Sequence, residues 1–406
     1  MERFALSRMK EWKENENRKP LIIRGARQVG KTWIMKTFGQ QYFEKTAYVN
    51  FDNNARMKQV FEGDLDIERL VLSISAETGV SIEAENTLII FDEVQEVPKA
   101  LTSLKYFYEN APQYAIVAAG SLLGVALHQG TSFPVGKVDF LDLYPLNFRE
   151  FLCAMGEKQF VSMLDSCDTQ MVTVFKTKYI ERLREYYFVG GMPEVVKDFS
   201  EKKDYNRVRA IQKNLINYYQ QDFSKHAEIK LVPRLNLVWN SIPMQLAKEN
   251  KKYIYGQVRE GSRAKDFELA IQWLLDCGLI HKVQRIQKPD LPLKAYIDFD
   301  AFKLFLVDIG LLIAMTDLDA KVIIEGNKIF TEFKGALTEQ YILQQLISDV
   351  GVIPYYYSTQ NSKGEIDFLV QGKTSVIPIE VKAEENLKAK SLKAFCAVSY
   401  THLTLP

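Results

Sequence analysis

The chain has 406 residues, of which 47% are hydrophobic and 25% are charged, and its formal net charge is +1. This length exceeds what one ordinary hydrophobic core accommodates, so we expect two or three domains. A net charge near zero argues against a protein that binds polyanions over its whole surface, but it is compatible with a local basic patch. Four cysteines without a C-x-x-C pair argue against a structural zinc site and indicate a reducing compartment.

The first 20 residues are strongly polar, unlike the apolar core of a signal peptide. The longest apolar stretch, residues 115–127, is too short to span a bilayer and is interrupted by glycine and serine. We therefore expect a cytoplasmic protein without membrane segments.

Residues 1–150 alternate between strand-like and helix-like patterns. The strand patterns cover residues 21–24, 47–51, 87–91, 114–119 and 138–143. Helical patterns, including residues 31–38, 66–78 and 99–110, lie between them. This alternation predicts a parallel sheet covered by helices on both faces.

The first expected strand runs into a phosphate-binding loop. Residues 25–32 read G-A-R-Q-V-G-K-T, which is the pattern G-x-x-x-x-G-K-T placed between a strand and a helix. The glycines of such a loop let successive N–H groups point at phosphate oxygens. The expected nucleotide-binding residues are Gly25, Gln28, Val29, Gly30, Lys31 and Thr32. Lys31 would contact the β- and γ-phosphates as a catalytic residue, and the Thr32 hydroxyl would bind Mg²⁺.

The third expected strand ends in two acidic residues, Asp92 and Glu93. An aspartate at this position can hold the water shell of Mg²⁺ beside the phosphate loop. The adjacent Glu93 would then act as the general base that activates the attacking water. We therefore expect ATP and Mg²⁺ as cofactors, and the lack of an Asn/Thr-Lys-x-Asp motif mildly favours ATP over GTP.

The fourth expected strand ends just before Ser121. In the class of P-loop ATPases that has an additional strand in the sheet, this position often carries a polar residue that senses the γ-phosphate. We expect Ser121 to have this catalytic role. The other interpretation is a helix N-cap for residues 122–127.

The chain from residue 145 to 230 is helical in pattern and contains the breaker cluster Gly190-Gly191-Met192-Pro193, which predicts a hinge or a connector between helices. Residues 234–300 resemble a winged helix, with helices at 235–246 and 264–277, a strand opening at 278–283, a wing tip at 287–292 and a returning strand at 293–297. Basic residues surround this segment: Arg259, Arg263, Lys265, Lys282, Arg285 and Lys288. A basic winged helix can contact DNA phosphates, but such modules also serve as ATPase lids and protein contacts.

The C-terminal region contains a second constellation of charged residues. Asp367 lies in the strand pattern 365–370, and Glu380 and Lys382 lie in the partner strand expected at 376–382, on one face. Glu339 falls on the apolar stripe of a helix expected at 331–349 rather than on its solvent face.

An acid on a helix, then Asp, then Glu-x-Lys is the pattern of restriction-endonuclease-like nucleases. In that chemistry Glu339, Asp367 and Glu380 would bind Mg²⁺, and Lys382 would be the catalytic lysine of this second site. The alternative is a solvated Glu–Lys pair on an exposed strand, and the spacing alone does not separate the two. We expect a nuclease-type fold and leave its activity open.

The chain resembles a large prokaryotic family of ATPases that pair an N-terminal AAA domain with a C-terminal domain of unknown function. The segments that carry the resemblance are LIIRGARQVGKT at 21–32, FDEVQ at 91–95, YPLNFREF at 144–151, GGMP at 190–193, WLLDCGLIHKV at 273–283, FKLFLVDIGLL at 302–312, and the residues at 365–368 and 380–382. The resemblance covers nearly the whole chain. It implies an AAA-type nucleotide-binding core, a winged-helix middle and a nuclease-like tail.

Two features depart from the family pattern. Lys137 stands where the family usually has an arginine, so Arg24, Arg27 and Arg149 are the other candidates for an arginine finger. Residues 398–406 replace the expected continuation of the C-terminal domain and look like translated adapter sequence. We therefore expect this domain to be truncated.

The fold class we expect is α/β. The expected domains are an AAA-type, P-loop NTPase domain at 1–150, a helical connector at 151–230, a winged-helix domain at 231–315 and a restriction-endonuclease-like α/β domain at 316–406. We expect an ATP hydrolase whose nucleotide state repositions the later domains on a partner, with DNA as the favoured partner. Two alternatives remain: an ATP-gated, Mg²⁺-dependent nuclease, and a nucleotide-dependent module that binds a protein partner with negligible turnover. The oligomeric state is left open.

Overall fold

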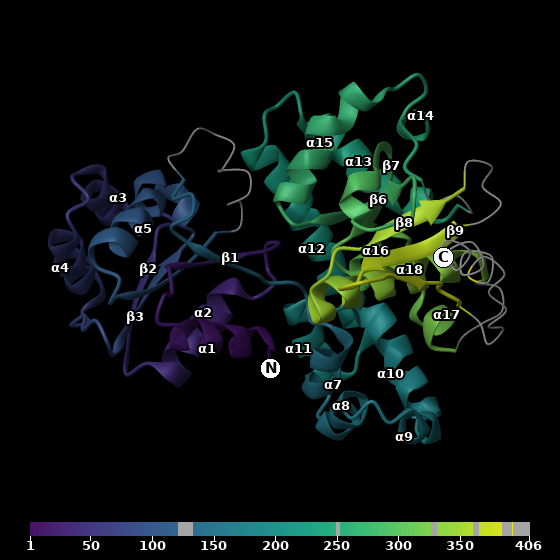
Figure 1. Ribbon diagram of the computed structural model, residues 1–406, viewed down its shortest axis with the longest axis horizontal. Coiled ribbons are helices and arrows are strands. Elements are labelled where there is room, and N and C mark those ends of the chain that lie inside the picture. The colour runs from purple at the N-terminus through teal and green to yellow at the C-terminus, as the bar shows by residue number, and fades with distance from the viewer. Residues whose placement is uncertain (121–132, 249–251, 326–330, 360–364, 384–391, 393–406) are drawn as a thin grey trace, which may run out of the picture. The chain divides into compact units, whose positions relative to one another are not determined.

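The computed structural model describes residues 1–120, 133–248, 252–325, 331–359, 365–383 and 392 (Figure 1). The chain divides into two compact units. Residues 1–144 together with 276–278 form the first unit, and residues 145–275 together with 279–406 form the second.

A parallel five-stranded sheet forms the centre of the first unit. Its strands are β1 (Leu21–Arg24), β2 (Lys45–Asn50), β3 (Thr87–Asp92), β4 (Ala115–Ala119) and β5 (Asp139–Asp142). Their order is β2-β3-β4-β1-β5, and all four pairings are parallel. The additional strand β4 therefore lies between β1, which leads into the phosphate loop, and β3, which ends in Asp92. This confirms the P-loop NTPase sheet expected from the alternating pattern.

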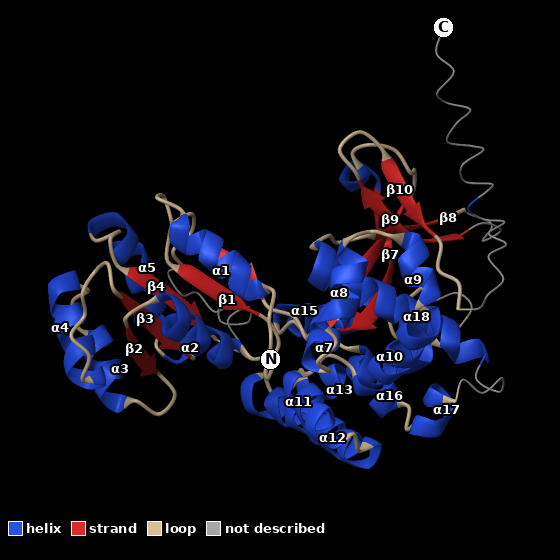
Figure 2. Cartoon of the chain, turned by 90° about the horizontal axis from the view of Figure 1, so that it is seen from below, coloured by secondary structure: helices blue, strands red, loops and turns tan. Residues whose placement is uncertain are grey.

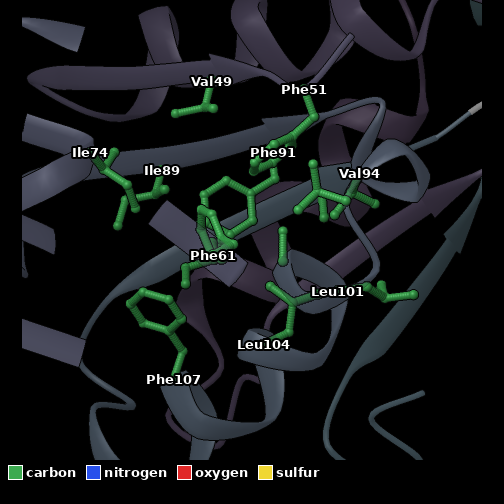
Figure 3. Packing of buried hydrophobic residues seen from close by; sticks show 14 of the residues in the cluster. Val49, Phe51, Phe61, Ile74, Ile89, Phe91, Val94, Leu101, Leu104 and Phe107 are labelled. Atoms are coloured by element: carbon green, nitrogen blue, oxygen red, sulfur yellow. The ribbon is translucent and has the colours of Figure 1, made fainter. Parts of the chain in front are cut away.

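The helices of the first unit are α1 (Ala5–Glu14), α2 (Lys31–Tyr42), α3 (Ala55–Glu62), α4 (Ile67–Thr78) and α5 (Pro98–Asn110), with a 3-10 turn η1 (Val94–Glu96) after β3. Figure 3 shows the core between the sheet and α3, α4 and α5. There the rings of Phe51, Phe61 and Phe91 meet edge to face at 5.4–5.6 Å. Because Phe91 directly precedes Asp92, this packing fixes the end of β3.

The second unit begins with helices. They are α7 (Phe148–Ala154), α8 (Lys158–Asp165), α9 (Thr169–Val174), α10 (Lys176–Val189), α11 (Pro193–Lys202) and α12 (Tyr205–His226). The breaker cluster connects α10 to α11, as expected of a connector. Gly190 has φ +73°, and a Cβ on Gly191 would lie 2.1 Å from the Leu146 carbonyl oxygen. The Gly191 N–H donates to the buried Asp308 carboxylate at 2.6 Å, so this connector is tightly packed.

A second five-stranded sheet joins two segments that the sequence assigns to different domains (Figure 2). Helices α13 (Val232–Leu246), α14 (Tyr255–Val258) and α15 (Ala264–Asp276) precede β6 (Ile280–Ile286) and β7 (Ile297–Leu306). The later elements are α16 (Ile309–Met315), α17 (Ala320–Ile324), α18 (Thr331–Gln345), a π-helical turn η4 (Leu346–Val350), β8 (Tyr355–Ser358), β9 (Glu365–Gln371) and β10 (Val376–Ile379). The strand order is β10-β9-β8-β6-β7, and β6 pairs with β8 in parallel.

Two local expectations were wrong. The returning strand of the wing does not cover residues 293–297, because Leu293–Tyr296 form a 3-10 turn (η2) whose Leu293 packs with Ile286, and β7 begins at Ile297. The partner strand β10 ends at Ile379, so Glu380 and Lys382 follow the strand instead of lying within it. Here the Val381 N–H donates to the Asp367 carboxylate at 2.7 Å rather than to a strand neighbour.

Among the described residues, no helix is long and apolar enough to cross a membrane.

Candidate nucleotide-binding site

The phosphate loop leaves β1 and ends at the first turn of α2. Its backbone takes left-handed or related conformations at Gly25 (φ +146°), Gln28 (φ +66°) and Gly30 (φ +94°). A Cβ on Gly25 would lie 2.1 Å from the Leu143 carbonyl oxygen, so only glycine fits there. Gly30 is the N-cap of α2, and Val29 is buried beneath the loop. The N-terminus of α2 therefore follows directly on the loop, and a helix N-terminus favours a bound phosphate.

The Lys31 side chain is buried inside the loop. Its ammonium group donates to the carbonyl oxygens of Gly25 and Ala26, both at 2.8 Å. Burial lowers the pKa of Lys31 to about 8, although the negative charges of Glu93 and Asp92 act to raise it. A buried lysine that is bonded only to neutral carbonyls would be stabilised in its charged form by a nearby phosphate.

Asp92 and Thr32 come together from β3 and α2. The Thr32 hydroxyl donates to Asp92 Oδ2 at 2.7 Å, and Asp92 is 3% exposed. A carboxylate and a hydroxyl in contact beside a phosphate loop are the oxygen ligands that Mg²⁺ prefers. The residues present therefore fit a magnesium ion, which Thr32 and Asp92 would hold directly or through water and which would neutralise phosphate charge.

Glu93 follows Asp92 in a left-handed backbone conformation (φ +51°). The Gln95 amide donates to Glu93 Oε2 at 2.7 Å and holds the carboxylate. The negative charge of Glu93 acts to raise the pKa of Lys31. Gln95 lies against Gly120, where a Cβ would come within 2.0 Å of Gln95 Oε1. The structure therefore provides an oriented carboxylate at the position expected for the general base.

Three of the remaining candidate residues have ion-pair partners of their own. Ser121 lies outside the described residues. Lys137 forms an ion pair with Glu109 at 3.0 Å, and Arg24 forms a bidentate pair with Asp142. In the second unit Arg149 bonds to Asp349 at 3.0 Å and also pairs with Asp165.

Two residues of the site were missed by the sequence analysis. The Tyr48 hydroxyl on β2 donates to Asp92 Oδ2 at 2.9 Å. Gln95 was quoted within the family motif but given no role. The sheet order brings Tyr48 to Asp92 across 44 positions of sequence. No local pattern could have shown that contact.

The basic residues of the expected winged helix divide into two groups. Arg285 pairs with Asp298, Lys288 pairs with Asp290 at 2.7 Å, and Lys282 lies 4.3 Å from the ring centroid of Phe302. Arg259, Arg263 and Lys265 are exposed at the start of α15. These three form no ion pair with the residues that the structure describes. Within the expected winged helix, these three basic residues lie before and at the N-terminus of α15, in a segment that also contains the exposed Glu260.

The C-terminal carboxylates gather around a buried lysine that the sequence analysis missed. Lys303 on β7 has a side chain only 1% exposed, and it lies 2.5 Å from Glu365 and 3.6 Å from Glu339. Burial alone would lower the pKa of Lys303. The charges of Glu339 and Glu365 outweigh this effect and raise the pKa above its ordinary value, so the lysine stays charged. Burial and the nearby Glu339 raise the pKa of Asp367 to about 7.

Glu380 and Lys382 pair with each other beside this cluster. Across the described ranges, no group of three or more His, Cys, Asp or Glu side chains is arranged to hold a metal ion. The charge of Glu339 and Glu365 is balanced by Lys303 instead. The second magnesium site expected at Glu339, Asp367 and Glu380 therefore stays a prediction.

Comparison with protein families gives three matches. Residues 17–152 match the AAA domain family, residues 180–322 match a domain of unknown function (DUF8612), and residues 334–403 match a second domain of unknown function (DUF4143). No curated protein matches the chain.

Solved structures give weaker likenesses. A Walker-type ATPase of Pyrococcus abyssi is 15% identical with a TM-score of 0.48, over 78% of this chain and 95% of that chain. The Aeropyrum pernix Orc1 protein, solved in complex with DNA, is 13% identical with a TM-score of 0.27, over 77% of this chain and 91% of that one. Likenesses of this strength carry no functional information for this chain.

The AAA match covers the parallel sheet, the phosphate loop and Asp92. The same segment contains the lysine, hydroxyl and carboxylates that the sequence predicts for a nucleotide site. Residues 17–152 have the P-loop NTPase fold and are similar to AAA-type ATPase domains.

Proposed function

We propose that this protein hydrolyses ATP at the site formed by Lys31, Thr32, Asp92 and Glu93, and that hydrolysis repositions its second unit on DNA. The contact between the Thr32 hydroxyl and Asp92 carries the first part of the proposal, because it brings the phosphate loop and the acidic strand end into one site. Loss of the γ-phosphate would remove the ligand that Lys31 contacts. Such a loss is the usual origin of a switch in nucleotide-dependent proteins.

The DNA part of the proposal rests on the exposed residues Arg259, Arg263 and Lys265. Two exposed or half-exposed acids, Asp266 and Glu268, follow them on α15, so the body of this helix is poorly suited to a negatively charged groove. We therefore propose that the protein contacts phosphates from the start of α15 and does not read bases. Binding of this kind is independent of sequence and strongly dependent on salt.

The direct test is steady-state ATP hydrolysis by the full chain, with and without duplex or branched DNA. Turnover that increases with DNA supports the proposal. Turnover that is unchanged by either DNA would contradict the DNA part and leave the ATPase part intact. Bound ATP with negligible turnover would instead favour a nucleotide-dependent module that binds a protein partner.

The basic residues give a sharper prediction for DNA binding. Replacing Arg259, Arg263 and Lys265 together with alanine should reduce the slope of log K against log salt by about 3, at roughly 0.9 for each DNA phosphate that is no longer neutralised. Fluorescence anisotropy with two duplexes of unrelated sequence measures this slope. Lys288→Ala is the matched control on the wing, since Asp290 already neutralises Lys288. An unchanged slope in the triple variant would place the DNA-binding surface elsewhere.

Cleavage of nucleic acid by the C-terminal region is a second candidate function. It is favoured by the position of Lys382, whose pKa is raised first by its bond to Glu380 and also by the charge of Asp367. This candidate predicts cutting of duplex or branched DNA that Asp367→Ala and Lys382→Ala both abolish. Gel assays in Mg²⁺ or Mn²⁺ measure it. Intact DNA with the unmodified protein would exclude the activity on those substrates.

A further inference from the structure

Asp92 is held by three donors, and two of them bond to the same oxygen. The Thr32 hydroxyl donates to Oδ2 at 2.7 Å and the Tyr48 hydroxyl donates to Oδ2 at 2.9 Å. The Glu93 N–H donates to Oδ1 at 3.1 Å. Thr32 belongs to the phosphate loop and Glu93 directly follows Asp92, whereas Tyr48 comes from the neighbouring strand β2.

The position of Tyr48 is set by the sheet and by α2. In the parallel pairing of β2 with β3, Tyr48 lies opposite Ile90 and Asn50 lies opposite Asp92. The Lys36 ammonium group on α2 lies 3.7 Å from the centroid of the Tyr48 ring. Since α2 begins at the phosphate loop, this contact ties the tyrosine to the same helix that carries Lys31 and Thr32.

The Tyr48 hydroxyl acts as a donor to the carboxylate. A phenolic hydroxyl has an ordinary pKa of about 10, so it keeps its proton at neutral pH and can donate to the oxygen 2.9 Å away. A carboxylate oxygen accepts hydrogen bonds, so the proton in this bond comes from the tyrosine hydroxyl. The bond restrains the Asp92 carboxylate to one orientation relative to Thr32.

We propose that Tyr48 is a positioning residue for the magnesium site: its hydroxyl fixes the Asp92 carboxylate so that Asp92 and Thr32 face the ion together. This inference rests on the proposed role of Asp92 in holding the Mg²⁺ shell. A residue of this kind affects how much Mg²⁺ strengthens nucleotide binding. It does not affect the affinity of the loop for the nucleotide alone.

The test compares Tyr48→Phe with the unmodified full chain, using a fluorescent ATP analogue in Mg²⁺ and in excess EDTA. The ratio of the two dissociation constants measures how strongly the metal assists nucleotide binding. We expect Tyr48→Phe to reduce this ratio about 10- to 150-fold, the range for one hydrogen bond to a charged group, with the EDTA value unchanged. Phenylalanine keeps the ring that contacts Lys36, and the far-ultraviolet circular dichroism spectrum reports whether the variant is folded.

Tyr42→Phe is the matched control, because Tyr42 lies on α2 and its hydroxyl makes no hydrogen bond with the described residues. An unchanged ratio in Tyr48→Phe, or an equal weakening in EDTA, overturns the positioning role. The unmodified protein separates this from a failure of the proposed function. If its own ratio is near one, Asp92 and Thr32 do not hold a metal.

Discussion

Replacing Glu93 with glutamine is expected to reduce kcat for ATP hydrolysis by about 10²- to 10⁴-fold, which is the usual contribution of a general base. Glutamine keeps the size of the side chain and its contact with Gln95, but it cannot accept a proton from water. The affinity for ATP should change little, because the phosphate contacts come from the loop and Lys31. Phosphate release at saturating ATP, together with a nucleotide-binding titration, measures both quantities.

Glu96→Gln is the control for this experiment. Glu96 is exposed and lies in the 3-10 turn that follows Glu93, so the same chemical change there leaves the site intact. Turnover of Glu93→Gln within 10-fold of the unmodified protein would show that another group activates the water. Gln95→Ala should give a smaller loss than Glu93→Gln, since it removes only the group that orients the carboxylate.

Replacing Lys303 with methionine should lower the free energy of unfolding of the second unit by about 3–5 kcal/mol, the cost of removing one partner from a buried ion pair. Methionine fills much of the same volume, but Glu339 and Glu365 lose the cation that balances them. Urea denaturation, monitored by circular dichroism, measures the change.

Two further variants separate charge from packing. Adding Glu365→Gln to Lys303→Met should recover part of the loss, because it removes one of the uncompensated charges. Lys288→Met breaks an exposed pair with Asp290 and should leave stability nearly unchanged. If Lys303→Met were as stable as Lys288→Met, the carboxylates around Lys303 would not be charged in the folded protein.

The sequence predicts those parts of the site that are local in the chain. The phosphate loop is one continuous segment, and Asp92 and Glu93 lie at the end of an apolar strand. The spacing of the motif and the apolar pattern of the strand are therefore enough to predict them. Tyr48 and Lys303 are different, because their partners lie 44 and 62 positions away and depend on strand order and register. Leu293 was expected in the returning strand of the wing, whereas it lies in a 3-10 turn and packs with Ile286.

The pairing of β6 with β8 has a mechanical consequence. A shared ladder of backbone hydrogen bonds connects the wing strands to the C-terminal strands, so neither segment can swing without the other unless those bonds break. Any motion driven by ATP would therefore move the wing strands and the C-terminal strands together as one rigid body. For the same reason, ending the chain after residue 315 would leave β6 with an unpaired edge, and a shortened protein of this kind should self-associate.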